Sequence, residues 1–243
     1  MDLNQDENSL LEYVREARER GEARPPRAEK LGVGIGGAYR VQDALGEGRE
    51  VVGYKLGLIK PEDQAQMGVD SPIYGRIYSG LILQSPVQLS LFLQPQFEPE
   101  LAVVLGEDLA PGASPGAAQA AIGGIYLGID FLSNVWEGGT PVVADMVASN
   151  VAGGGFLLGE RLLSEPLEGH LRLYHNGNLL TEGPVGDMGN MGERLVWLSE
   201  AVGGLHAGQT IFLGTPAVAQ EAVTGTVELH GPHGSVLVAS LQG

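Results

Sequence analysis

Two carboxylates lie two residues apart in the stretch Phe97-Glu98-Pro99-Glu100-Leu101-Ala102-Val103-Val104-Leu105, directly before an uninterrupted apolar run. If this stretch is a β-strand, its side chains alternate between two faces, so Glu98 and Glu100 share one face. Two anions side by side at the mouth of a buried strand repel each other and resist desolvation. The stretch therefore predicts a nearby cation that offsets their charge.

The source of that cation is not local. No lysine or arginine occurs between Arg76 and Arg161, so the positive charge comes from a distant part of the chain or from a bound metal ion. Hard oxygen ligands that leave room for water suit magnesium or manganese. The alternative interpretation is a pair of solvated glutamates on an edge strand, and the spacing alone favours neither interpretation.

The composition predicts a globular protein with many turns and many short strands. The chain has 243 residues, of which 43% are hydrophobic, enough for a globular interior. Its 38 glycines and 14 prolines indicate many turns and hence many short strands. We expect a helical N-terminal arm over residues 1–50 and one compact, β-rich catalytic core over residues 51–243.

The net charge of −16 argues against nucleic-acid binding, which requires clustered lysine and arginine. Six of the 14 basic residues lie in the first 30 positions, interleaved with glutamate as on a solvated helix. The absence of cysteine excludes disulfides, thiolate metal sites and thiol nucleophiles. Because the sequence has no signal-peptide pattern and no apolar run of transmembrane length, we expect a soluble, cytoplasmic protein without membrane contacts.

Hydrophobic periodicity and turn signals predict the order of the elements. Helices are expected at 9–21, 38–45, 117–121 and 192–202, with one or two helical turns at 61–67. Strands are expected at 51–58, 81–91, 98–105, 122–132 and 153–158, and in a hairpin of 170–175 and 178–180 around Asn176-Gly177. The glycine-rich stretch 32–37 lacks a preceding strand and the spacing of a nucleotide-binding motif, so we expect a loop there.

Lys55 and Asp130 are the other charged residues in strongly apolar settings. Lys55 is the single charge in the run 51–58, and a buried ammonium there needs an anionic partner such as Glu98, Glu100 or Asp130. The alternative is an edge-strand lysine that reaches water. Asp130 would complete a facial set of three carboxylates with open positions for water and substrate. The five histidines all lie in the C-terminal third and are expected at the surface.

Two further motifs point to a known family: Gly53-Tyr54-Lys55-Leu56-Gly57-Leu58, and Met67-Gly68-Val69-Asp70-Ser71-Pro72-Ile73-Tyr74-Gly75. With the Glu98-Pro99-Glu100 motif they resemble the hydratase/decarboxylase branch of the fumarylacetoacetate hydrolase superfamily. That branch contains 2-oxopent-4-enoate hydratases and 4-oxalocrotonate decarboxylases of aromatic catabolism. The resemblance extends over nearly the whole chain from residue 38 and includes the segments 145–150, 156–159, 176–177, 189–190 and 207–208.

The resemblance implies a magnesium ion held by Glu98, Glu100 and a third acid, which falls on Asp130 where this branch usually has glutamate. It places the family lysine on Lys55, near the substrate carboxylate and the path of proton transfer. Asp145 is a further catalytic candidate, although it could instead cap the turn beside it. The resemblance implies an α+β fold, a mixed, mostly β roll or barrel-like core with a smaller helical N-terminal part. Members of the family commonly form oligomers.

Three more residues are predicted to bind substrate. Asn150 is expected to contact substrate or to orient water. A decarboxylase must also hold a second carboxylate, and Arg76 is the best-placed cation by sequence, with Tyr74 beside it. The sequence of residues 67–75 resembles that of the decarboxylases slightly more than that of the hydratases. The chain also departs from the family by replacing polar or charged residues with Ile59, Gln96, Val135 and Ser149.

We therefore expect a magnesium- or manganese-dependent lyase that decarboxylates 4-oxalocrotonate, a small 2-oxo acid, to 2-hydroxypenta-2,4-dienoate. The alternatives are hydration of 2-oxopent-4-enoate in its dienol form, or a non-catalytic partner subunit of a hydratase–decarboxylase complex. The lost polar residues favour the partner subunit, whereas the intact Glu98, Glu100 and Lys55 oppose it. A fourth hypothesis is hydrolysis of carbon–carbon bonds in acylpyruvates, which occurs elsewhere in the superfamily and needs a general base to activate water. The usual catalytic histidine lies upstream of the glutamate pair, and no histidine precedes His170 here, which counts against this activity. A homo-oligomer is expected.

Overall fold

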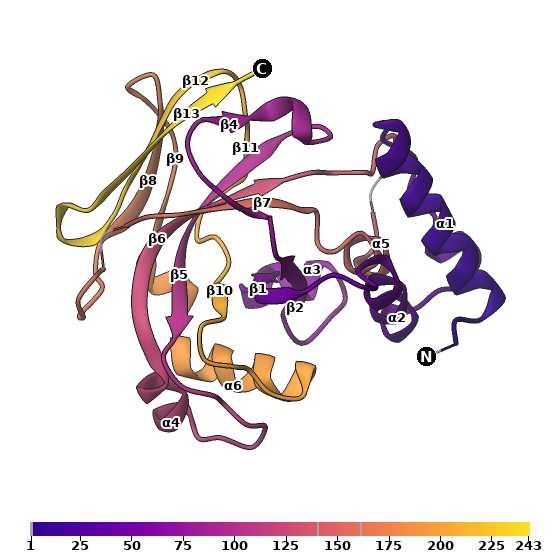
Figure 1. Ribbon diagram of the computed structural model, residues 1–243, viewed down its shortest axis with the longest axis horizontal. Coiled ribbons are helices and arrows are strands. Elements are labelled where there is room, and N and C mark those ends of the chain that lie inside the picture. The colour runs from indigo at the N-terminus through magenta and orange to yellow at the C-terminus, as the bar shows by residue number, and fades with distance from the viewer. Residues whose placement is uncertain (1, 140, 161) are drawn as a thin grey trace.

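Two β-sheets form the body of the protein in a computed structural model that describes residues 2–139, 141–160 and 162–243. The larger sheet has the order β2-β1-β10-β5-β6-β7-β3, with β11 paired to β5, and the smaller one has the order β4-β13-β12-β8-β9 (Figure 1). The strands of the larger sheet are β1 (Val51–Gly57), β2 (Ile73–Tyr78), β3 (Ile82–Leu83), β5 (Gln96–Leu105), β6 (Ile122–Leu132), β7 (Gly153–Leu158), β10 (Thr210–Phe212) and β11 (Gln220–Glu221). Those of the smaller sheet are β4 (Val87–Gln88), β8 (His170–His175), β9 (Asn178–Pro184), β12 (Gly225–His230) and β13 (Val236–Gln242).

The helices flank these sheets, which confirms the predicted α+β class. They are α1 (Gln5–Arg20), α2 (Ile35–Leu45), α3 (Pro61–Gln66), α4 (Pro115–Ala120), α5 (Val143–Ala148) and α6 (Met191–Val202). Short 3-10 turns occupy η1 (Glu29–Leu31), η2 (Leu89–Leu91), η3 (Val185–Met188) and η4 (Pro232–Gly234). Helix α1 begins before its predicted start because Asn4 and Glu7 form a capping box. Within the described residues, no helix has the length and apolarity needed to cross a bilayer.

Strands β5 and β6 are the longest pair and the centre of the larger sheet. On one face their apolar side chains, such as Leu101 and Ile129, are fully buried in the main core. That core also contains Leu173 and Leu229 from the smaller sheet, so the two sheets pack against each other through it. Because side chains alternate along a strand, this packing fixes Glu98, Glu100 and Asp130 on the opposite face.

The N-terminal helices share a second core with α5, on the side of the molecule away from the smaller sheet (Figure 1). Leu10 and Val14 of α1, Val41 of α2 and Val147 of α5 are completely buried in it. The prediction of a loop at 32–37 is wrong in part, because α2 begins at Ile35. A side chain at position 37 would approach Glu7 Oε1 to 2.9 Å, so the glycine permits close packing of α1 and α2.

Most strand predictions are confirmed, but one is not. The hairpin of β8 and β9 turns at Asn176 and Gly177, both with positive φ angles, as an Asn-Gly turn requires. Strand β6 spans the predicted residues 122–132. The segment 81–91, however, contains only the two-residue strands β3 and β4 and the turn η2, because Pro86 and the polar residues beside it interrupt the pairing.

Candidate active site

Three strands of the larger sheet bring four charged side chains together on one face. Strand β1 pairs with β10, β10 with β5, and β5 with β6. This register places Lys55 on the same face as Glu98 and Glu100, and Glu98 directly opposite Asp130. Carboxylate oxygens of the three acids lie within 4.8 Å of one another. The structure thus brings together all four residues that the sequence predicted for the metal and for proton transfer.

Both edge-strand interpretations are wrong, since β1 and β5 each have a neighbouring strand on both sides. Lys55 is 2% exposed, and Glu100 and Asp130 are completely buried, whereas Glu98 is partly exposed. Lys55 Nζ forms an ion pair with Asp130 Oδ2 at 2.5 Å. The backbone N–H of Gly214 donates to Glu100 Oε2 at 2.7 Å. Glu100 Oε1 and Asp130 Oδ1 accept no hydrogen bond from any described residue.

Burial raises the pKa values of all three acids, and repulsion by neighbouring carboxylates adds to the effect for Glu98 and Glu100. Burial raises the pKa of Glu98 to about 7, against the opposing effect of the Lys55 ammonium. Burial, with the charges of Asp130 and Glu98, raises the pKa of Glu100 well above its ordinary range. Burial likewise raises the pKa of Asp130. Burial by itself lowers the pKa of Lys55, but the three carboxylates outweigh it and the net shift is upward.

This donor set fits a divalent cation with a preference for oxygen ligands. Three ionised carboxylates and one ammonium leave two negative charges, which a divalent cation neutralises. Buried carboxylate oxygens without a hydrogen-bond partner, such as Glu100 Oε1 and Asp130 Oδ1, are costly unless something binds them. The absence of sulfur and imidazole from the group favours magnesium or manganese over zinc.

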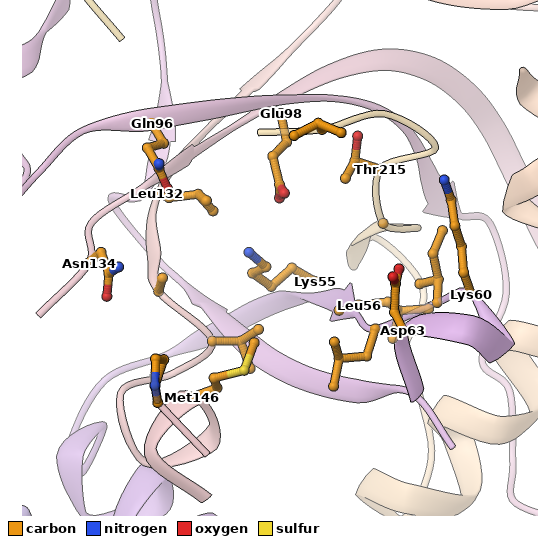
Figure 2. A pocket seen from close by; sticks show the side chains of 18 of the residues that line it. Lys55, Leu56, Lys60, Asp63, Gln96, Glu98, Leu132, Asn134, Met146 and Thr215 are labelled. Carbon is orange, nitrogen blue, oxygen red and sulfur yellow. The ribbon is translucent and has the colours of Figure 1, made fainter. Parts of the chain in front are cut away.

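A cavity of about 460 Å³ opens beside these residues. In Figure 2 the side chains of Glu98 and Lys55 point toward each other across it. Lys60, Asp63 and Thr215 lie at one end, and Gln96 and Asn134 lie at the other (Figure 2). Its apolar wall includes Leu56, Ile59, Leu132, Trp136, Met146 and Val151. The cavity therefore offers charged groups at its centre, polar groups at both ends and apolar surface between them.

Asp145, predicted to be catalytic, holds the backbone instead and does not line the cavity. Its Oδ1 accepts hydrogen bonds from the N–H groups of Arg27 at 2.9 Å and Ala28 at 2.7 Å. Its Oδ2 accepts from the N–H of Val142 at 3.1 Å, at the start of α5. Both oxygens are thus occupied by backbone donors, and Asp145 ties the N-terminal arm to α5. The alternative cap interpretation fits this geometry.

Asn150 has a similar backbone role beside the cavity. Its Oδ1 accepts from the N–H of Arg76 at 2.7 Å, and its Nδ2 donates to the carbonyl of Arg76 at 2.9 Å. Asn150, Val151 and Ala152 all have positive φ angles, an uncommon conformation for residues with a side chain. The Asn150 bonds fix this strained turn, and Val151 and Ala152 then form part of the cavity wall. The Asn150 side chain thus positions this part of the wall, and its contact with substrate stays a prediction.

Arg76 and Tyr74, predicted to bind substrate, lie on the other face of the sheet. Arg76 pairs with Tyr54 and Tyr74 pairs with Leu56, so both point away from the face that carries Lys55. The Arg76 guanidinium binds Gln42 and Asp43, and Tyr74 stacks on Tyr39. Neither residue lines the cavity. A shift of one residue in the register between β1 and β2 would reverse which side chains face the cavity. The sequence alone does not reveal that register.

The sequence reasoning missed Lys60 as a site residue. Lys60 lines the cavity, and its Nζ donates to the carbonyl of Pro216 at 2.8 Å, across the mouth. The sequence did contain one signal for Lys60, namely that lysine is rare in this chain. Only three lysines occur, and Lys55 and Lys60 are the two that follow Lys30. Gly214, which supplies the hydrogen bond to Glu100, had no sequence signal.

Three of the four departures from the family pattern lie at the cavity. Ile59, Gln96 and Ser149 line it, whereas Val135 is buried in the N-terminal core. Ser149 Oγ accepts a hydrogen bond from the Trp136 indole at 3.0 Å, which holds that ring against the wall. These substitutions therefore change the cavity wall and leave the charged centre intact.

Residues 56–243 match the family described as fumarylacetoacetate (FAA) hydrolase, C-terminal. The chain belongs to the fumarylacetoacetate hydrolase family. The matched region starts within β1 and includes Glu98, Glu100 and Asp130. Membership in the fumarylacetoacetate hydrolase family confirms the resemblance seen in the sequence motifs.

Relatives within the fumarylacetoacetate hydrolase family carry two names. A 4-oxalocrotonate decarboxylase of Pseudomonas sp is 27% identical over 124 residues, 50% of this chain and 47% of the relative. A 2-keto-4-pentenoate hydratase of Dechloromonas aromatica is 33% identical over 132 residues, 51% of this chain and 50% of the relative. The match therefore spans about half the length of each of these curated relatives.

Solved structures support the same fold over the whole chain. The 4-oxalocrotonate decarboxylase from Pseudomonas putida G7, complexed with calcium and acetate, superposes with a TM-score of 0.87. It is 22% identical, and the match covers 99% of both chains. The same decarboxylase complexed with magnesium and adipate also gives a TM-score of 0.87 at 21% identity. This similarity confirms the predicted fold of the fumarylacetoacetate hydrolase type.

Proposed function

We propose that this protein is a divalent-metal-dependent lyase of a small 2-oxo acid, and that its reaction is the decarboxylation of 4-oxalocrotonate to 2-hydroxypenta-2,4-dienoate. The observation that carries this proposal is the group of Glu98, Glu100, Asp130 and Lys55 at the wall of a cavity. The decarboxylase and hydratase names of the relatives support the reaction class.

Glu98, Glu100 and Asp130 would hold the metal ion, with magnesium or manganese as the expected ion. A bound magnesium ion would supply a Lewis acid and electron sink for a 2-oxo acid that binds through its carboxylate and 2-oxygen. The magnesium and calcium complexes of the decarboxylase of similar fold support this choice. Glu98 is the ligand candidate that faces the cavity, so it is the residue nearest to arriving substrate.

Lys55 would hold and deliver the proton. Its ammonium forms an ion pair with Asp130 and faces the cavity. Loss of carbon dioxide from the far end of a vinylogous 2-oxo acid leaves a dienolate, and the 2-oxygen must then take up a proton. An ammonium ion at this place both attracts the substrate carboxylate and supplies that proton.

Lys60 would bind the distal carboxylate, the role first predicted for Arg76. Within the described part of the chain, Lys55 and Lys60 are the only cationic side chains that line the cavity. Lys55 is buried and paired with Asp130 at 2.5 Å, whereas Lys60 forms a longer ion pair with Asp187 at 3.7 Å, so Lys60 is the cation that a second anionic group can reach. The side chain of Lys60 is 22% exposed, and it lies at the opposite end of the cavity from Asn134 (Figure 2). A second cation favours a dicarboxylate substrate over a monoacid.

The proposal is tested by carbon dioxide release from 4-oxalocrotonate, measured with magnesium and again with EDTA. Release that requires magnesium establishes the decarboxylase. Consumption of 2-hydroxypenta-2,4-dienoate without carbon dioxide release from 4-oxalocrotonate would assign the hydratase instead, which the hydratase relatives make the second candidate. Failure of both reactions in the presence of bound magnesium would favour the partner-subunit interpretation. The predicted oligomer is tested by the molar mass in solution.

A further inference from the structure

A smaller hollow of about 200 Å³ lies beside the strained turn at residues 150–152, and Asn150 of that turn lines it. Arg18 of α1 and Arg49 line it, together with Leu91, Phe92 and Ser133. Arg18 is partly buried, whereas Arg49 is exposed at the mouth. The hollow is separate from the cavity that contains Lys55 and Glu98, since Arg18 and Arg49 do not line that cavity.

The two guanidinium groups have no acidic partner. Among the residues that the structure describes, neither arginine forms an ion pair with a carboxylate. Burial and the charge of Arg49 lower the pKa of Arg18 to about 10, which still leaves it protonated at neutral pH. Two like charges are thus held together in a partly desolvated place.

Other contacts fix both side chains in position. The Arg49 guanidinium lies over the ring of Tyr78, 4.0 Å from its centroid. Arg18 Nη2 donates to the carbonyl of Ser149 at 2.9 Å. A guanidinium has five N–H donors, so these contacts leave donors available toward the hollow. Positioned, unpaired guanidinium groups match the geometry of carboxylate and phosphate oxygens.

We propose that Arg18 and Arg49 form a binding site for a small oxyanion, a carboxylate or a phosphate group, held between the two guanidinium groups. The anion neutralises charges that otherwise repel each other, which makes its binding favourable. The volume suits a small anion, and the apolar side chains of Leu91 and Phe92 accommodate a short carbon chain. Arg18 also donates to the carbonyl of Ser149, which lines the larger cavity. Arg18 would therefore contact both the bound anion and a residue of that cavity wall.

The test is calorimetric titration of the whole protein in EDTA at fixed ionic strength, with inorganic phosphate in one arm and succinate in the other. We expect saturable binding of one anion per chain in at least one arm, and the stronger arm identifies the chemical group. Arg49→Gln and Arg18→Lys should each weaken binding by about tenfold. Arg20→Gln, an exposed arginine of the same helix, should leave it unchanged.

Absence of saturable binding in both arms overturns the proposal, as does binding that Arg49→Gln leaves unchanged. Arg49 is exposed, so its substitution should not unfold the protein, and circular dichroism of both variants verifies this. The assay contains neither metal nor substrate. Its result is therefore independent of whether the protein proves to be a decarboxylase.

Discussion

Glu98 and Asp130 stand directly opposite each other on adjacent strands of the larger sheet. Two like charges in this relationship are destabilising, and here a third carboxylate, Glu100, lies within reach of both. Lys55 neutralises only one of the three charges. The fold therefore carries an electrostatic cost at this place that protonation or a bound cation relieves.

The metal-free protein should lose stability as the pH rises from 5 to 8. The folded-state pKa values of Glu98, Glu100 and Asp130 are raised, to about 7 for Glu98. A raised pKa contributes stability that is fully present below the unfolded-state value and is lost as the pH rises through the folded-state value. We expect the melting temperature in EDTA to fall by about 3 °C or more across this range. Magnesium should reverse the fall at pH 8, and a flat or rising curve in EDTA would contradict this expectation.

Glu98→Gln should abolish magnesium-dependent turnover without unfolding the protein. The amide keeps the size of the side chain but loses the charge that a metal ion requires, so we expect a loss of at least about 100-fold. In EDTA at pH 8 this variant should melt at a higher temperature than the wild type, because one repelling charge is gone. The matched control is Glu107→Gln, an exposed glutamate just after β5. Normal activity of Glu98→Gln would refute the metal assignment.

Lys60→Gln should separate dicarboxylate from monoacid recognition. We expect the KM for 4-oxalocrotonate to rise by about 10- to 100-fold, since a charge-assisted hydrogen bond is worth about 1.5–3 kcal/mol. The affinity for 2-hydroxypenta-2,4-dienoate, which has one carboxylate, should change little. Lys30→Gln, at an exposed position, provides the control. An unchanged KM for 4-oxalocrotonate would show that Lys60 does not bind the distal carboxylate.

Gly214→Ala should disturb the carboxylate that Gly214 supports. Its φ angle is +89°, and an added Cβ would lie 2.5 Å from Ile59 Cγ2. Gly208→Ala is the control, since its φ angle is +85° and nothing lies within 4 Å of its Cβ. Both should lose about 1 kcal/mol of unfolding free energy to backbone strain. Only Gly214→Ala should also weaken magnesium binding, and equal effects on magnesium would argue against the Glu100 contact.

Asp145→Ala should lower stability rather than slow the reaction. It leaves the buried N–H of Ala28 and the partly buried N–H of Arg27 without an acceptor, at a cost of about 1–3 kcal/mol for the buried group and less for the other. Thermal unfolding measures this loss, while kcat well below the melting temperature should stay within about twofold of the wild type. If kcat collapsed while the melting temperature held, Asp145 would be catalytic after all.

The four charged residues of the site were predictable because each lies within or beside a run of apolar residues. Glu98, Glu100, Lys55 and Asp130 are the charges that interrupt otherwise hydrophobic strands, and burial forces such charges to meet. The resemblance to the family added the identity of the group they serve. Helices and the hairpin followed from local signals, namely caps, periodicity and an Asn-Gly turn.

Other residues were placed less well. Arg76 and Tyr74 lie next to a correctly predicted motif, but their face depends on the register between β1 and β2. Asp145 and Asn150 are polar and buried, and only the structure shows that backbone groups occupy their oxygens. Lys60 reaches the cavity because the segment 213–218 folds back over it, a long-range contact that no local pattern encodes.

The parallel pairing of β1 with β10 also has a consequence for the order of folding. It joins Lys55 to Phe212, and the next residues bring Gly214 to Glu100. A nascent chain that has emerged only through β7 therefore lacks both the strand that positions Lys55 and the donor to Glu100. Contacts between distant segments form slowly, so the group of three carboxylates gains the positioned Lys55 and the Gly214 donor late in folding. A metal ion that recognises this group binds the finished fold and so opposes global unfolding.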